Sequence, residues 1–208
     1  MKLSKPLNVI LGNQIRVEIL RTFIKYPGEF TGRHVARLCK LPQATVQKQL
    51  RVLVDNDILI SKWAGRSKIF SLNVQNILYP ALKDLYEAEG KVLIQIENLI
   101  KQAIKRSSYF RNQLAHASIY GSVVKGEETP ESDIDLFLLF KKDFDEHLIS
   151  EKFENVNEQI TTISGMGLHP YAQSLKKVGK INKKLLRDVE KDSRLVYGKS
   201  IEELKKEW

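Results

Sequence analysis

Two short apolar runs, separated by a polar loop, constrain the fold of this chain more than any other feature. The first run ends at Gly121-Ser122, and Asp133-Ile134-Asp135 opens the second. Both runs are rich in β-branched and aromatic residues and are bounded by Gly, Pro or Ser, which is typical of buried β-strands. Because residues two apart on a strand project to the same face, we expect Asp133 and Asp135 to lie side by side, with Ile134 in the core.

The chemistry of these residues favours a site for metal-bound phosphate. Two carboxylates at the start of a buried strand are costly unless a cation compensates them, and Mg²⁺ prefers such oxygen ligands. Gly121 allows the backbone to approach a phosphate closely, and the Ser122 hydroxyl can donate to it. The pattern therefore predicts phosphoryl or nucleotidyl transfer. The alternative is an Asx-rich turn between two strands, in which Asp133 caps backbone amides.

The spacing of these residues also matches a known family. Gly121-Ser122, ten further residues and Asp133-x-Asp135 between two strands resemble the minimal nucleotidyltransferases of the DNA polymerase beta-like superfamily. The run 125–127, Lys-Gly-Glu, is similar to the basic-Gly-acidic run of that family, and Ser132 precedes the first Asp as is common there. The resemblance extends over about residues 91–199.

The resemblance implies a set of roles for these residues. Asp133 and Asp135 would be catalytic and would hold Mg²⁺ or Mn²⁺. The phosphate tail of a nucleoside triphosphate, expected to be ATP, would be bound by Gly121, Ser122 and Lys125. A nucleoside monophosphate would pass to an acceptor, and pyrophosphate would leave.

One departure from the family concerns the third carboxylate, which its active members generally carry on a later strand. This chain has no Asp or Glu between Glu158 and Asp188. The next expected strand, 168–175, offers His169, Tyr171, Gln173 and Ser174 instead. Three interpretations therefore stay open: an enzyme with slow or acceptor-restricted transfer, a transcriptional regulator that binds nucleotide without turnover, and an antitoxin-like enzyme that modifies a HEPN-type protein partner.

Charge is distributed very unevenly along the chain. Residues 1–75 contain 13 Lys and Arg against 4 Asp and Glu, whereas residues 76–208 contain 21 of each. The whole net charge of +9 thus lies in the first third of the chain. This asymmetry predicts a polyanion-binding module joined to a neutral one.

The same basic segment has the periodicity of a small helical domain. Apolar residues recur at helical spacing from Ile10 to Ile24, and Thr31 is a suitable N-cap for a second helix that ends near Cys39. Pro42 is allowed at the first position of a third helix. The apolar face of that helix would consist of Val46, Leu50, Leu53 and Val54.

A β-hairpin with a basic turn is expected next, from the runs 58–63 and 68–72. Three helices and a hairpin resemble the winged helix-turn-helix domains of ArsR-type regulators, which implies a third helix in the major groove of double-stranded DNA. The exposed residues of this helix would be Gln43, Thr45, Gln47, Lys48 and Arg51, and on the hairpin Arg66 and Lys68 would hold phosphate or a minor groove. The alternative is a winged helix used for protein contact.

Together these patterns predict an α+β chain. We expect a winged helix-turn-helix domain at 1–75, a linker helix at 76–90 that ends at Gly90, and a nucleotidyltransferase-like α/β domain at 91–208.

Winged-helix repressors usually read two-fold sites in pairs, so a homodimer is expected. The sequence has no apolar stretch that suggests a membrane span, and its single cysteine, Cys39, suits a reducing cytoplasm. We expect the basic run 176–187 to be a solvated helix face, with contact to a triphosphate or a nucleic acid as the alternative.

Overall fold

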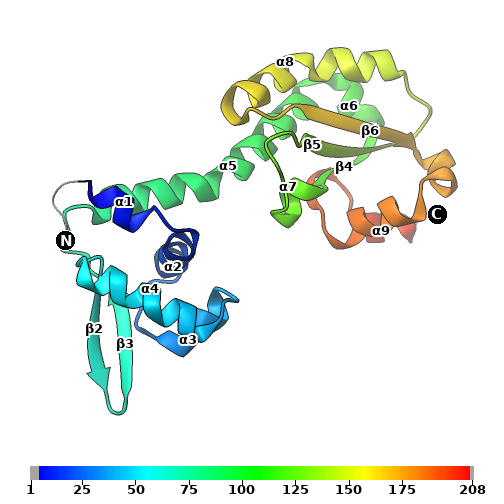
Figure 1. Cartoon of the computed structure of the whole chain (residues 1–208). Helices are drawn as coiled ribbons and strands as arrows, with labels where there is room; N and C mark the ends of the chain where they lie inside the picture. The colour runs from blue at the N-terminus through cyan, green and yellow to red at the C-terminus, as the bar shows by residue number, and fades with distance from the viewer. Residues whose placement is uncertain (1–4, 207–208) are drawn as a thin grey trace. The chain divides into compact units, whose positions relative to one another are not determined.

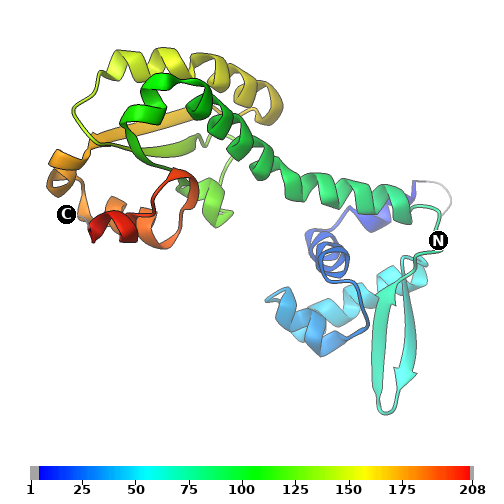
Figure 2. The same cartoon turned by 180° about the vertical axis from the view of Figure 1, so that it is seen from behind.

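The structure is a computed structural model that describes residues 5–206 (Figures 1 and 2). It divides into two compact units, residues 1–90 and residues 91–208. Together they have a mixed α+β composition, and each unit has its own sheet.

The first unit contains the expected helices and hairpin. Its elements are α1 (Pro6–Ile10), α2 (Gln14–Lys25), β1 (Phe30–Thr31), α3 (Gly32–Leu38), α4 (Gln43–Asp55), β2 (Leu59–Ala64), β3 (Ser67–Leu72) and the first part of α5 (Tyr79–Arg106). The strands form an antiparallel sheet in the order β1-β3-β2. The core between helices and sheet includes Leu20, Phe23, Val46, Leu50 and Phe70.

Capping residues decide where these helices begin. The Asn13 side chain accepts hydrogen bonds from the backbone N–H groups of Ile15 and Arg16, so α2 begins at Gln14. The expectation of one helix running on from Ile10 is therefore wrong, because α1 ends there. Thr31 caps α3 as expected, through a hydrogen bond from the His34 N–H. Pro42 is the N-cap of α4 rather than its first helical residue.

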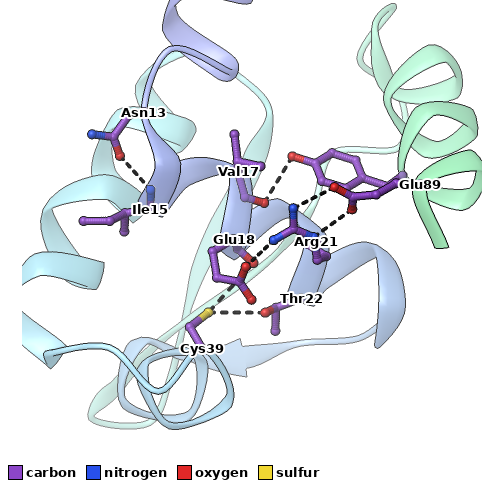
Figure 3. Close-up of polar contacts among 9 residues, drawn as sticks. Asn13, Ile15, Val17, Glu18, Arg21, Thr22, Cys39 and Glu89 are labelled. Atoms are coloured by element: carbon purple, nitrogen blue, oxygen red, sulfur yellow. Dashed lines mark hydrogen bonds and ion pairs between the residues drawn. The ribbon is translucent and has the colours of Figure 1, made fainter. Parts of the chain in front are cut away.

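The start of α5 is anchored to α2 by polar contacts (Figure 3). The Tyr86 hydroxyl donates to the carbonyl of Val17 at 3.1 Å, and burial raises the pKa of Tyr86 to about 12. The Arg21 guanidinium pairs with both Glu18 and Glu89, and its hydrogen bond lowers the pKa of Glu89. These contacts explain why the first turns of α5 belong to the N-terminal unit.

A helix break at Gly90 was expected, but α5 continues through this residue and is 28 residues long in all. A glycine inside a helix costs roughly 1 kcal/mol relative to alanine, and the packed turns on either side outweigh that cost. Leu82 and Tyr86 pack in the core of the first unit, and Ile100 and Ile104 pack in the core of the second.

The second unit contains a four-stranded sheet in the order β6-β5-β4-β7. Its elements after α5 are α6 (Ser108–Gln113), β4 (Leu114–Tyr120), α7 (Ser122–Lys125), β5 (Ile134–Phe140), α8 (Glu146–Ser164), β6 (Leu168–Ser174), the 3₁₀ helix η1 (Leu175–Lys180), α9 (Lys183–Lys191), β7 (Arg194–Gly198) and α10 (Ile201–Lys205). Strand β4 is antiparallel to both β5 and β7, whereas β5 and β6 are parallel and are connected through α8. The two strands expected on either side of the polar loop are confirmed as β4 and β5, and the strand expected at 168–175 is confirmed as β6.

Alternate residues of β5 pack on opposite faces of this sheet, which α8 and α9 cover from the two sides (Figure 1). Ile134, Leu136 and Leu138 join the core formed with α5, α6 and α8. Phe137 and Leu139 join the second core, formed with η1, α9 and α10. Because side chains alternate along a strand, Asp135 lies on the face of Phe137 and Leu139.

A buried histidine ties β4 to the residue that follows β7. His116 is 2% exposed, and its Nδ1 and Nε2 lie 2.7 Å from the Lys199 carbonyl oxygen and 2.8 Å from Ser118 Oγ. Since a carbonyl only accepts, Nδ1 carries the proton and neutral Nε2 accepts from the Ser118 hydroxyl. Burial lowers the pKa of His116 from its usual 6.5.

This histidine is expected to make the fold sensitive to acid. The unfolded chain binds a proton at His116 at a higher pH than the folded chain does. The contribution of neutral His116 to the free energy of unfolding is therefore present above the unfolded pKa and is lost as the pH falls below it. We expect His116→Gln to lower the free energy of unfolding at neutral pH, and to reduce its decline between about pH 7 and pH 5. Urea unfolding at both pH values measures this, and an unchanged decline in the variant would contradict it.

Candidate functional site

Gly121 brings the end of β4 into contact with β5. Its φ of +84° lies in the region that favours glycine, and it turns the chain from Tyr120 into α7. A Cβ at this position would lie 2.3 Å from Asp135 Oδ2. The Gly-Ser sequence and the second acid of the motif are thus in direct contact, and glycine is the residue that fits.

The two acids occupy the N-terminal end of β5 on either side of a buried residue. Ile134 is fully buried, Asp133 lies just before the strand and is exposed, and the Asp135 side chain is 31% exposed. Asp133 lies against Gly167, where a Cβ would be 3.0 Å from Asp133 Oδ1. Both carboxylates therefore lie at the end of the sheet where β6 begins.

Strand β6 places His169 next to the acids. The parallel register pairs His169 with Asp135, and the His169 Nδ1 atom lies 3.6 Å from Asp135 Oδ1. Tyr171 pairs with Phe137, and the two rings stack with centroids 5.9 Å apart. Gln173 pairs with Leu139 further along the strand. Of these three side chains, His169 is the one that the register places beside the acidic pair.

Ser174, the fourth polar candidate on this strand, has a different partner. It is fully buried and its hydroxyl donates to Asp143 at 3.2 Å. Asp143 also pairs with Lys177, and the two hydrogen bonds lower the pKa of its carboxyl group. Ser174 is thus held at the C-terminal end of β6, away from Asp133 and Asp135.

Tyr120 is a neighbour of the acids that the sequence analysis missed. It pairs with Asp135 across β4 and β5. Burial, together with the charges of Asp135 and Tyr171, raises the pKa of Tyr120 to about 12. Its phenol therefore stays protonated at neutral pH and can act as a hydrogen-bond donor but not as a base. Its position directly before the Gly-Ser sequence was the available signal.

The donor set fits an ion that is bound together with phosphate. Within residues 5–206, no group of three or more His, Cys, Asp and Glu side chains is arranged to hold a metal ion. Asp133 and Asp135 offer carboxylate oxygens, which Mg²⁺ and Mn²⁺ accept, and phosphate oxygens and water can complete the coordination. Ser122 begins α7, and Lys125 ends it with an exposed side chain.

The basic run 176–187 is two elements rather than the single helix face expected. The 3₁₀ helix η1 ends before Ile181, and the Asn182 side chain caps α9 by accepting from the Lys184 N–H at 2.8 Å. The basic side chains are exposed, as expected for solvated positions: Lys176, Lys177, Lys180, Lys183, Lys184 and Arg187.

The residues expected to contact DNA are distributed over α4 and the hairpin. Exposed side chains are found at Gln43, Lys48, Arg51, Arg66 and Lys68, whereas Thr45 is half-buried. The expectation that Thr45 and Gln47 are exposed is wrong, because both are half-buried. The Gln47 side chain packs against the start of α3, where a Cβ on Gly32 would lie 2.3 Å from Gln47 Oε1.

None of the helices within residues 5–206 combines the length and the apolar character needed to cross a bilayer.

Comparison with known proteins identifies the second half of the chain. Residues 98–202, about half of the chain, match the family model described as Polymerase beta, Nucleotidyltransferase. No curated protein sequence gives a significant match.

Several solved structures are similar to parts of the chain. A toxin–antitoxin structure with AMP-PNP is 15% identical, with 52% of this chain and 78% of that chain covered and a TM-score of 0.37. The tri-AMPylated HEPN toxin of Shewanella oneidensis in complex with MNT antitoxin is 13% identical, covering 54% and 76%, with a TM-score of 0.33. Reduced HlyU from Vibrio cholerae is 18% identical, covering 42% and 87%, with a TM-score of 0.33.

Proposed function

Because this chain belongs to the polymerase beta nucleotidyltransferase family, we propose that its C-terminal unit transfers a nucleoside monophosphate from a nucleoside triphosphate, ATP in the first instance, to an acceptor. The observation that carries this proposal is the contact between Gly121 and Asp135. A turn that excludes even a methyl group lies against one carboxylate, and Asp133 is two residues away. This contact brings the paired carboxylates to the same end of the sheet as a stretch of backbone that a phosphate can approach.

Each residue of this site has a distinct proposed role. Asp133 and Asp135 would hold Mg²⁺ or Mn²⁺, which when bound offsets the charge of the triphosphate. The Ser122 hydroxyl and the backbone beside Gly121 donate to phosphate oxygens, and Lys125 adds a positive charge. An acceptor oxygen forms a bond to the α-phosphorus, and the bond from the α-phosphorus to pyrophosphate breaks.

Incubation of the chain with labelled nucleoside triphosphates, Mg²⁺ and candidate acceptors tests this activity. Transferred label or released pyrophosphate is the expected result, and the variant with both Asp133→Asn and Asp135→Asn should lose it. A HEPN-type protein is included among the candidate acceptors. Product formation that is equal in the wild type and in the double variant would refute the proposed site.

A second candidate function is favoured by the lack of an acid on β6. In a regulator that binds nucleotide without turnover, Asp133 and Asp135 would hold a metal–nucleotide complex, and binding would tune DNA affinity. Calorimetry combined with product analysis separates the two functions, because a regulator binds the triphosphate and leaves it intact.

For the N-terminal unit we propose a winged helix-turn-helix of the ArsR type that binds double-stranded DNA as a homodimer. The net charge of +9 in residues 1–75 and the exposed cations of α4 and the hairpin support this proposal. Helix α4 would enter the major groove through Gln43, Lys48 and Arg51, with Thr45 at its edge. Gln47 packs on α3 and is therefore not among the proposed base contacts.

Arg66→Ala is expected to weaken the binding of duplex DNA and to lower its salt dependence. Each phosphate contact releases counterions and adds about 0.9 to the slope of log affinity against log salt. Loss of one such contact should lower the slope by about that amount without changing sequence preference. Titrations at several salt concentrations measure the slope. Binding by the wild type that does not depend on salt would contradict the prediction.

A further inference from the structure

The β2–β3 hairpin carries an aromatic side chain that the fold leaves in solvent. Trp63, next to the last residue of β2, is 72% exposed. Ala64 pairs with Ser67, so the strands are joined by the two residues Gly65 and Arg66. The hairpin projects beyond the helices of its unit in both views (Figures 1 and 2). Trp63 therefore lies near the tip of a narrow projection.

An exposed tryptophan at this place indicates a contact made outside the chain. Tryptophan is strongly buried on average and contributes a large apolar area where it is covered. Leu59 lies on the same face of β2 as Trp63 and is 1% exposed, so the core covers this face at one end of the strand and not at the other. The intramolecular packing gives Trp63 no structural role that would require an indole.

The charges around Trp63 identify the class of partner. Lys68 is its direct partner across the two strands, and Arg66 occupies the turn. The segment 62–68 has three cations and no acid. Lys62, on the opposite face, is paired with Glu29, whereas Arg66 and Lys68 are exposed. A flat apolar ring between two cations is complementary to a polyanion that also presents apolar surface, which is the chemistry of sugars and bases between phosphates.

We propose that Trp63 inserts into the minor groove of duplex DNA and packs on deoxyribose and base edges, while Arg66 and Lys68 contact the flanking phosphates. This inference rests on the DNA binding proposed above. The minor groove is about 6 Å wide, which suits a single ring at the tip of a two-stranded projection. Apolar side chains inserted there unstack base steps and bend the duplex. The hairpin would then recognise the shape of the DNA, in addition to the base contacts that α4 makes.

The test uses the full chain with Trp208→Phe, so that Trp63 is the remaining tryptophan. Titration with a short mixed-sequence duplex is expected to quench the Trp63 emission in step with binding measured by anisotropy of the labelled DNA. Trp63→Ala should weaken binding on the order of 10-fold, because a lost aromatic–base contact has that size. Its salt slope should stay unchanged, since no charge is lost, in contrast to Arg66→Ala.

Ile60→Ala is the matched control. Ile60 is on the same strand, is 52% exposed and points to the opposite face, so its removal should leave DNA affinity unchanged. Because Trp63 is so exposed, Trp63→Ala should keep the wild-type melting temperature, and a loss of affinity then reports contact rather than folding.

The outcomes separate this inference from the proposal on which it depends. DNA binding with unchanged Trp63 emission, and with equal affinity of Trp63→Ala and Ile60→Ala, overturns the inference and leaves DNA binding intact. Emission that changes with protein concentration in the absence of DNA assigns Trp63 to a contact between copies of the chain and also overturns it. Emission that responds to anionic lipid vesicles and not to duplex does the same. The absence of any DNA binding refutes both proposals.

Discussion

Gly121→Ala is expected to abolish nucleotidyl transfer while the chain stays folded. The added methyl group would lie 2.3 Å from Asp135 Oδ2, and the φ of +84° disfavours any residue with a Cβ. Relief of this clash must displace the Asp135 carboxylate or the turn that is proposed to approach the phosphates. A displacement of about 1 Å in a positioned group can cost about 100-fold in rate, and this change affects both halves of the site.

Gly126→Ala provides a matched control for this prediction. Gly126 is the C-cap residue that follows the same short helix, also has a positive φ, and has no atom within 4 Å of the position of an added Cβ. Its αL backbone (φ +68°, ψ +33°) tolerates a Cβ better than that of Gly121 (φ +84°, ψ −153°), and the added methyl group meets no atom, so pyrophosphate release should fall only slightly. Equal losses in the two variants would mean that strain in the loop, rather than the contact with Asp135, limits the reaction.

The parts of this fold that sequence reasoning could reach are those set by local periodicity. Ile134 between two acids specifies which residues of β5 share a face, and that alternation is enough to place Asp133 and Asp135 at one end of the sheet. Thr31 carries its capping information in its own side chain. In both cases the signal lies within a few residues of the feature that it determines.

The parts that sequence reasoning missed depend on contacts between distant segments. The pairing of His169 with Asp135 follows from the register of two parallel strands joined by a 19-residue helix, and no local pattern fixes that register. Gln47 is a polar residue at a helix position where exposure is expected, but Gly32 leaves space into which its side chain packs. Gly90 breaks the local helix pattern, whereas packing on both sides keeps α5 continuous.

The register also decides where a third acid would have to be placed. In the parallel pairing Asp135 faces His169, whereas Tyr171 faces Phe137 and Gln173 faces Leu139. Each step of two residues moves a side chain about 6.6 Å along the strand. An acid at position 173 would therefore lie far from the acidic pair, and an acid at position 171 would replace a ring that stacks on Phe137.

His169→Asp is accordingly expected to increase nucleotidyl transfer. The new carboxylate would face Asp135 from β6, where His169 Nδ1 now lies 3.6 Å from Asp135 Oδ1. A carboxylate in this place can accept the proton of the acceptor hydroxyl, and general-base catalysis contributes about 10²–10⁴-fold. It also adds an oxygen ligand, so calorimetry should show tighter binding of Mg²⁺ together with the triphosphate. Pyrophosphate release under multiple turnover measures the gain.

Gln173→Asp is the control, since it adds the same charge to the same strand and the same face but opposite Leu139. It should leave the rate at the level of the unmodified protein, which separates the position of the acid from its charge. Robust turnover by the unmodified protein, with no gain in His169→Asp, would show that the reaction does not need an acid on β6. His169, the acceptor or a protein partner would then have to supply the base, because Tyr120, the other side chain paired with Asp135, stays protonated at neutral pH.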